Sequence, residues 1–189
     1  ITLTALPGTF SAPGRALAFI TPDEGQKVEV DISQLAKAFL IGDDRDFEDD
    51  PRFGLIVLSE IAGRALSPAV NDPGTAIYIL GVFVRLFALW CAPIKDSDMR
   101  VADYDRIEVP ELSIRDMFDD AFTAIARDGA GAIEVAGRLQ KTLESLTYVG
   151  DVTVSHTARQ HSRMALARAE HSRMALARAE HALQLPHDL

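Results

Sequence analysis

Residues 64–76 read RALSPAVNDPGTA, a dense set of polar and helix-breaking residues between two strongly apolar runs. Ser67 and Asp72 each stand directly before a proline, and a capping side chain followed by proline is typical of a helix start. The stretch therefore predicts that one helix ends, a short turn follows, and a second helix begins. This arrangement decides the fold of the most apolar part of the chain.

The run before this stretch, residues 51–66, predicts a helix that is buried on most sides because it is apolar nearly all round. Asp50 followed by Pro51 marks its start. Glu60 precedes Arg64 by four residues, the favourable order for an ion pair on a helix.

The run after it, residues 76–92, reads AIYILGVFVRLFALWCA. It is short for a membrane span of about 20 residues, and Arg85 stands near its middle, so we predict a core or interface helix. Its apolar surface exceeds what one small domain covers, which predicts a homo-oligomer, most simply a two-fold dimer.

The N-terminal third predicts a small β unit, then a helix and a loop. Residues 1–6 (ITLTAL) and 15–20 (RALAFI) resemble short strands around Pro-Gly turns, and 26–32 (QKVEVDI) alternates like a further strand. Asp31 is predicted to cap a helix that ends at Gly42. Residues 43–50 hold six acids in eight residues but lack the glycine and final glutamate of an EF-hand, which predicts a solvated loop.

The C-terminal half predicts further helices. Residues 100–109 suggest a short internal hairpin, and Ser113 opens a helix with one apolar stripe that ends at Gly129. A second helix follows, with apolar residues from Ala132 to Leu146 spaced four and three apart. The predicted fold class is α+β, mainly α: a small N-terminal β-hairpin unit followed by a bundle of five or six helices.

The decapeptide HSRMALARAE occurs at residues 161–170 and again at 171–180. A step of ten residues falls about 80° short of a full helical turn, so the two copies present different faces and cannot form a stacking repeat. We divide the chain into a β unit (1–30), a helical core domain (31–150) and a C-terminal helix (151–189).

Composition excludes several classes of function. The net charge is −9 and no run of Lys or Arg occurs, which argues against nucleic acid and anionic membrane surfaces as partners. Cys91 is the single cysteine, all five histidines lie between residues 156 and 187, and the phosphate-binding, zinc and hydrolase motifs are absent from the sequence. We therefore predict no metal, no cofactor and no catalytic residue.

The remaining polar residues form two candidate groups. The candidate ligand-binding residues are Arg64, Ser67, Asn71, Asp72 and Thr75, and the predicted structural polar cluster is Arg45, Asp50 and Glu60. Caps and ion pairs within the fold account for most of these groups. The alternatives are a small-anion or carboxylate site at the helix start, or a hydrolase that uses Arg64, Asn71 and Asp72. The sequence does not identify a ligand.

These same residues carry a resemblance. The stretch 41–77 is similar to the signature of the domain of unknown function 2254 family of bacterial predicted membrane proteins. The family pattern G-x-x-R-T-x-x-x-D-x-x-F-G-L followed by R-A-L-S-P-x-x-N-D-P-x-T-A falls on Gly42, Arg45, Asp50, Phe53, Gly54 and Leu55, then on Arg64 to Pro68, Asn71 to Pro73, Thr75 and Ala76. Asp46 stands where the family has threonine.

The resemblance implies that this chain is the soluble C-terminal domain of an inner membrane protein, on the cytoplasmic side. Members of that family have several transmembrane helices ahead of this region, so we expect spans of about 20 residues before Ile1. These upstream segments are the expected partners of this domain. The expected function is a non-enzymatic assembly, gating or ligand-sensing module; the alternative is the hydrolase or small-anion site at residues 64–76.

Overall fold

The structure, a computed structural model, describes residues 1–22, 31–94 and 104–184, with side chains as far as Arg178. These residues form two compact units, each described here by itself. Unit 1 comprises Ile1–Gly54 and Lys95–Leu112, and unit 2 comprises Leu55–Ile94 and Ser113–Leu189. In the described residues a two-stranded sheet is followed by six helices, which confirms the predicted α+β, mainly α, class.

Unit 1 contains the sheet. Strand β1 (Thr2–Leu3) pairs antiparallel with β2 (Ala18–Phe19), as the two apolar runs predict. Thr2 also forms a parallel bridge with Glu108, which belongs to the predicted internal hairpin. Residues 100–103 of that hairpin lie outside the described residues, as do residues 26–30 of the predicted third strand.

Helix α1 (Ile32–Lys37) confirms the predicted cap at Asp31, whose carboxylate accepts hydrogen bonds from the N–H groups of Ser33 and Gln34 at 2.9 and 3.3 Å. The prediction that this helix ends at Gly42 is wrong. None of the residues of α1 is buried, and Leu40 beyond it is fully exposed. Without an apolar face to pack, a short helix gains little from further turns.

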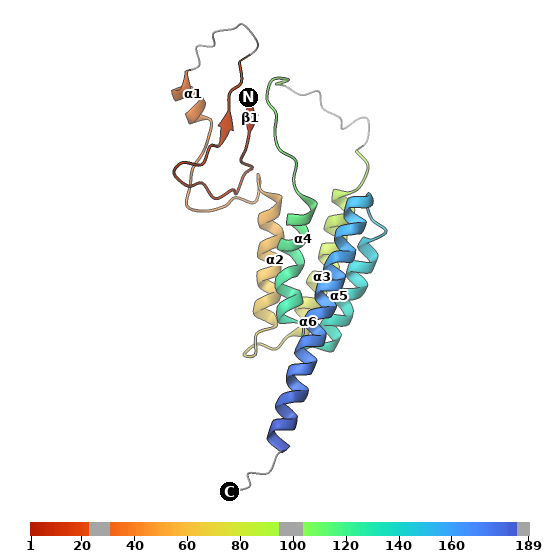
Figure 1. Ribbon diagram of the computed structural model, residues 1–189. Helices are drawn as coiled ribbons and strands as arrows, with labels where there is room; N and C mark the ends of the chain where they lie inside the picture. Colours follow the sequence, from red (N-terminus) through yellow and green to blue (C-terminus); the bar gives the residue numbers. More distant parts are fainter. Residues whose placement is uncertain (23–30, 95–103, 185–189) are drawn as a thin grey trace. The chain divides into compact units, whose positions relative to one another are not determined.

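Unit 2 is a helical bundle. Helix α2 (Pro51–Ala65) enters it from unit 1, followed by α3 (Pro73–Trp90), α4 (Ile114–Asp128), α5 (Ile133–Leu146) and α6 (Val152–Gln184). Helices α5 and α6, α4 and α6, and α3 and α5 pack side by side (Figure 1). The core lies among α3, α4, α5 and α6, each of which contributes buried apolar side chains.

Four phenylalanine rings fill that core, and all four side chains are fully buried. Phe87 packs on Phe118 with ring centroids 4.6 Å apart, and Phe83 meets Phe122 edge-on at 5.4 Å. Burying such rings supplies much of the stabilisation of a small domain. The apolar stripe predicted on the helix after Ser113 is therefore confirmed, as is its end at Gly129.

Both decapeptide copies lie in α6, whose C-terminal part extends beyond α4 and α5 (Figure 1). The first copy buries His161 and Ala165, which are each 5% exposed. In the second copy His171 and Ala175, the matching residues, are exposed. The two copies therefore differ in burial.

Candidate functional site

The stretch between α2 and α3 forms a compact turn, which we call the signature turn (residues 66–72). The carbonyl of Ser67 accepts hydrogen bonds from the N–H groups of Val70 and Asn71 at 3.1 and 2.8 Å. The hydroxyl of Ser67 donates to the carbonyl of Arg64 at 2.7 Å, near the end of α2. Asn71 has a φ of 48°, a left-handed conformation that asparagine tolerates better than most residues. Ser67 thus finishes a helix and Asp72 begins the next.

Asp72 caps α3 as predicted. Its carboxylate accepts a hydrogen bond from the Thr75 N–H at 3.2 Å and one from the Thr75 hydroxyl at 2.6 Å. The hydroxyl bond, followed by the N–H bond, lowers the pKa of this exposed carboxyl below its usual value. The N-terminal N–H of α3 therefore already has an anionic partner from the chain itself.

Arg64 and Glu60 lie apart from this cap. Both side chains are exposed. Among the described residues no ion pair joins Glu60 to Arg64, or Arg64 to Asp72, and Arg64 enters the turn only through its carbonyl. An exposed pair at this spacing is worth only a fraction of a kcal/mol, so hydration can replace it.

Arg45 and Asp50 form a second polar cluster, in unit 1. The Arg45 guanidinium contacts the Asp50 carboxylate through Nε at 2.7 Å and Nη2 at 2.5 Å, and Asp50 is 2% exposed. The other oxygen of Asp50 accepts the Phe53 N–H at 3.2 Å, which caps α2. Arg45 also lies over the Phe53 ring, 5.3 Å from its centroid. The structural polar cluster thus contains Arg45 and Asp50, while Glu60 lies elsewhere on α2.

Gly8 belongs to this cluster and was not singled out from the sequence. Its φ is 76°, and a Cβ at this position would overlap the Asp50 carboxylate and lie 2.7 Å from Arg45 Nε. Only glycine allows the backbone to approach this closely. The Pro7-Gly8 pair signals a turn, but nothing local in the sequence links that turn to Asp50.

The chemistry available at these residues is limited. Among the residues that the structure describes, no group of three His, Cys, Asp or Glu side chains could hold a metal ion. An anion that approached the start of α3 would meet the negative charge of Asp72. A ligand-binding role for Arg64, Ser67, Asn71, Asp72 and Thr75 stays a prediction.

Helix α3 is the one helix within the described ranges that is long and apolar enough to cross a membrane, with a mean hydropathy of 1.6 over 18 residues. It buries one side, formed by Ala76, Ile79, Leu80, Phe83 and Phe87. Only 28% of the window is buried, so much of its apolar surface faces outward. Length and composition alone do not distinguish a span from a core helix.

Comparison with known proteins now identifies the class. The chain belongs to the family described as predicted membrane protein (DUF2254), whose model matches residues 1–145. The resemblance carried by the signature is thereby confirmed.

Individual relatives match a short segment. The chain is similar to uncharacterized proteins Rv1290c of Mycobacterium tuberculosis and Mb1321c of Mycobacterium bovis, each 55% identical over 40 residues. That segment covers 21% of this chain and 8% of either mycobacterial protein. No solved structure matches the chain.

Proposed function

We propose that this region is a non-enzymatic assembly module of an integral membrane protein, on the cytoplasmic side of the inner membrane, which pairs with a second copy through α3. One observation carries the proposal: α3 has a mean hydropathy of 1.6, but only 28% of its 18 residues are buried. Apolar surface of this extent on a folded protein marks an interaction site.

The outer face of α3 has the composition of a protein interface. It comprises Tyr78, Arg85, Leu86, Leu89 and Trp90, all of them exposed. Tyr, Trp and Arg are the residues that most often dominate binding energy at protein interfaces. A charged arginine in this stripe is costly against lipid hydrocarbon but suits a hydrated protein contact. The face therefore favours a protein partner, and a second copy offers a self-complementary surface.

The polar signature supports a structural role within this module. Asp50 caps α2 and Asp72 caps α3, so each carboxylate satisfies N–H groups at a helix start. The Asp72 cap lies at the start of α3, the helix that carries the outer face. Cys91 is a free thiol whose pKa is raised by burial and then by the nearby Asp151 carboxylate, and an unpaired cysteine suits a reducing compartment.

Sedimentation of the 189-residue chain tests the pairing. We expect a dimer for the parent and a monomer for Leu89→Glu, because pairing would remove water from a carboxylate placed within the apolar outer face. Leu40→Glu makes the same change at a fully exposed leucine of unit 1 and should leave the dimer intact. A parent that is monomeric at high protein concentration would contradict the proposal.

Thiol labelling in cells tests the location. Met174 is 52% exposed on α6, so Met174→Cys in a Cys91→Ser background supplies one exposed thiol in this region, and the protein with Cys91→Ser alone is the control. In the full-length membrane protein, a maleimide that cannot cross membranes should label this thiol only after the cells are permeabilised. Labelling in intact cells would place the region outside the cytoplasm.

A further inference from the structure

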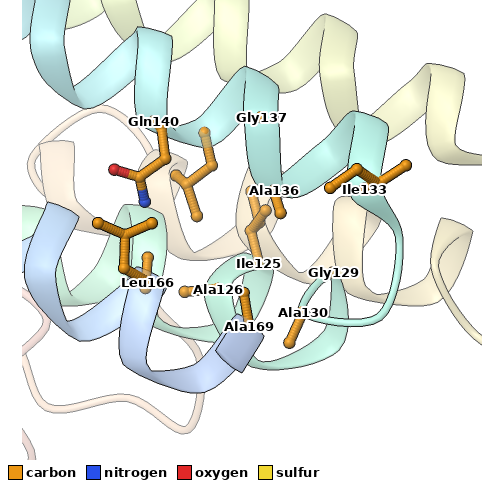
Figure 2. Close-up of a pocket in the computed structure, with 12 residues that line it drawn as sticks. Ile125, Ala126, Gly129, Ala130, Ile133, Ala136, Gly137, Gln140, Leu166 and Ala169 are labelled. Atoms are coloured by element: carbon orange, nitrogen blue, oxygen red, sulfur yellow. The ribbon is translucent and has the colours of Figure 1, made fainter. Parts of the chain in front are cut away.

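An apolar cavity of about 190 Å³ lies between α4, α5 and α6 in unit 2 (Figure 2). Small residues from all three helices form much of its wall: Ala126 of α4 and Gly129 directly after it, Ala136 and Gly137 of α5, and Ala165 and Ala169 of α6. Such short side chains leave the space between the helices unfilled, although protein interiors are otherwise closely packed. We call this space the apolar cavity.

The wall of the apolar cavity selects for hydrocarbon. Gln140 lies at one end, and its amide is already engaged: Nε2 donates to the Ser162 carbonyl at 3.2 Å, and Oε1 accepts from the Ser162 hydroxyl at 2.6 Å. No charged side chain lines the cavity. An enclosed apolar cavity of about 150 Å³ stays dry and binds benzene. This one is partly open, since Leu166 in its wall is 47% exposed, and it has room for a chain of about six to eight carbons.

A second, more open recess of about 610 Å³ adjoins the apolar cavity at Ala130 and carries positive charge. Its wall includes Arg127, Arg168 and His171, together with the acidic Asp128. Arg127 is engaged with Asp128 through two contacts of 2.7 and 2.9 Å. Arg168 is half-exposed and makes no hydrogen bond or ion pair within the described part of the chain. We call this the basic recess.

We propose that the apolar cavity and the basic recess together bind a single-chain amphiphile with an anionic head group, such as a medium-chain carboxylate. The hydrocarbon chain enters between α5 and α6, where its burial provides most of the affinity. The carboxylate faces Arg168, whose guanidinium is suited to carboxylate recognition. The assignment goes beyond the assembly role and does not depend on the outer face of α3.

Charge complementarity is what selects this ligand over a neutral one. Ala169 lines the cavity and Arg168, its neighbour in the chain, lines the recess, so the two features are continuous along one turn of α6. His171 adds positive charge to the same recess when it is protonated. A neutral chain of equal length would fill the cavity but gain nothing from Arg168.

The duplicated decapeptide provides matched controls. Ala165 of the first copy lines the apolar cavity, whereas Ala175 occupies the same position of the second copy and is exposed. Arg168 corresponds likewise to Arg178, which is exposed. Each pair of substitutions therefore changes the same residue in the same local sequence of one helix.

Calorimetric titration of the 189-residue chain with octanoate, and with octanol as the neutral probe, tests the proposal. Octanoate should bind the parent and Ala175→Leu alike, and binding should be lost in Ala165→Leu because the added side chain fills the cavity. Arg168→Gln should weaken octanoate binding about fivefold, which corresponds to the loss of a strong exposed ion pair. Arg178→Gln should bind octanoate as the parent does. Neither substitution should change the affinity for octanol.

Circular dichroism of each variant shows whether a loss of binding comes from a filled cavity or from an unfolded protein. If Ala165→Leu does not fold, the Arg168 and Arg178 pair decides the matter, since both changes lie on exposed or half-exposed side chains. Octanoate that fails to bind the parent would overturn the proposal. Equal octanoate affinity in the parent and in folded Ala165→Leu, or in the parent and Arg168→Gln, would also overturn it.

Discussion

Asp50 illustrates how much one carboxylate can stabilise. It is 2% exposed, caps α2 through the Phe53 N–H and contacts the Arg45 guanidinium. Arg45→Ala would leave this carboxylate buried without its partner, a change that costs about 3 kcal/mol of unfolding free energy. We take the lower end of the range for buried pairs because the Arg45 side chain is 30% exposed.

Urea denaturation measures this loss, with Asp44→Ala as the control. Asp44 is an exposed acid of the same loop, so its removal should change the unfolding free energy by less than about 0.5 kcal/mol. Equal stability of Arg45→Ala and Asp44→Ala would show that the pair contributes nothing to the fold.

Asp72 acts through hydrogen bonds alone, since Arg64 does not pair with it in the described residues. Asp72→Asn retains an acceptor for the Thr75 N–H, so we expect a small loss of stability, and a larger one for Asp72→Ala. Urea midpoints should rank the parent first, then Asp72→Asn, then Asp72→Ala. If both variants match the parent, the signature turn is better explained by a ligand than by the fold.

The same carboxyl predicts a pH dependence. Its folded-state pKa is lowered, so the stabilisation is present above the unfolded value of 3.8 and is lost as the pH falls through the folded value. Asp72→Asn should remove this part of the acid sensitivity, which acid titrations followed by circular dichroism would detect.

The role of a residue could be predicted where neighbouring residues in the sequence determine it. It could not be predicted where a contact with a distant part of the chain determines it. The caps at Asp31, Asp50, Asp72 and Ser113 follow from the acid or hydroxyl before each helix start. Gly8 was missed because its need for glycine comes from Asp50, far along the chain.

At the scale of elements, His161 links α4 and α6. Its ring packs near Phe118 and Phe122, and Nε2 lies 3.4 Å from an Asp119 oxygen. Burial lowers the pKa of His161; Asp119 opposes this, and Arg168 and Arg115 add to it. The neutral ring is therefore the form that the folded bundle favours.

Acid should loosen this contact. Because the folded-state pKa lies below the unfolded value of 6.5, the stabilisation is present above that value and is lost as the pH falls towards the folded pKa. We expect urea midpoints to drop between about pH 7 and about pH 5 in the parent. His161→Gln should flatten this slope, whereas His171→Gln, on an exposed side chain, should retain it. An unchanged slope in His161→Gln would contradict this account.

The second decapeptide copy should be dispensable for the fold. The described side chains of residues 171–178 are exposed or half-exposed, in contrast to His161 and Ala165 of the first copy. Deletion of residues 171–180 should change the unfolding free energy by no more than about 0.5 kcal/mol. A large fall in the melting temperature would show that this length of α6 is packed.

Helical elements were predictable where an apolar stripe persists for several turns, as in α4 and α5, because such a stripe must be buried to be stable. Where packing is absent the prediction failed, as at the end of α1. The bridge between Thr2 and Glu108 escaped prediction because strand pairing between distant segments leaves no local pattern.

At the scale of the whole molecule, the division between the two units cuts across the predicted domains. Unit 1 combines Ile1–Gly54 with Lys95–Leu112, so the segment after α3 returns to the unit that precedes it. Unit 2 holds the outer face of α3, the apolar cavity and α6. The proposed assembly and ligand surfaces therefore belong to the same unit, while the Arg45 and Asp50 cluster belongs to the other.

Pairing through α3 should make the melting temperature depend on protein concentration, which is not expected of a monomer. If two folded chains dissociate as they unfold, mass action makes the melting temperature rise with protein concentration. We expect this rise in the parent and in Leu40→Glu, and a melting temperature independent of concentration in Leu89→Glu. Calorimetric scans at a low and a high concentration, repeated at two scan rates to exclude irreversible unfolding, measure it. If the melting temperature of the parent does not depend on concentration, the outer face of α3, exposed at Tyr78, Leu89 and Trp90, does not pair with a second copy.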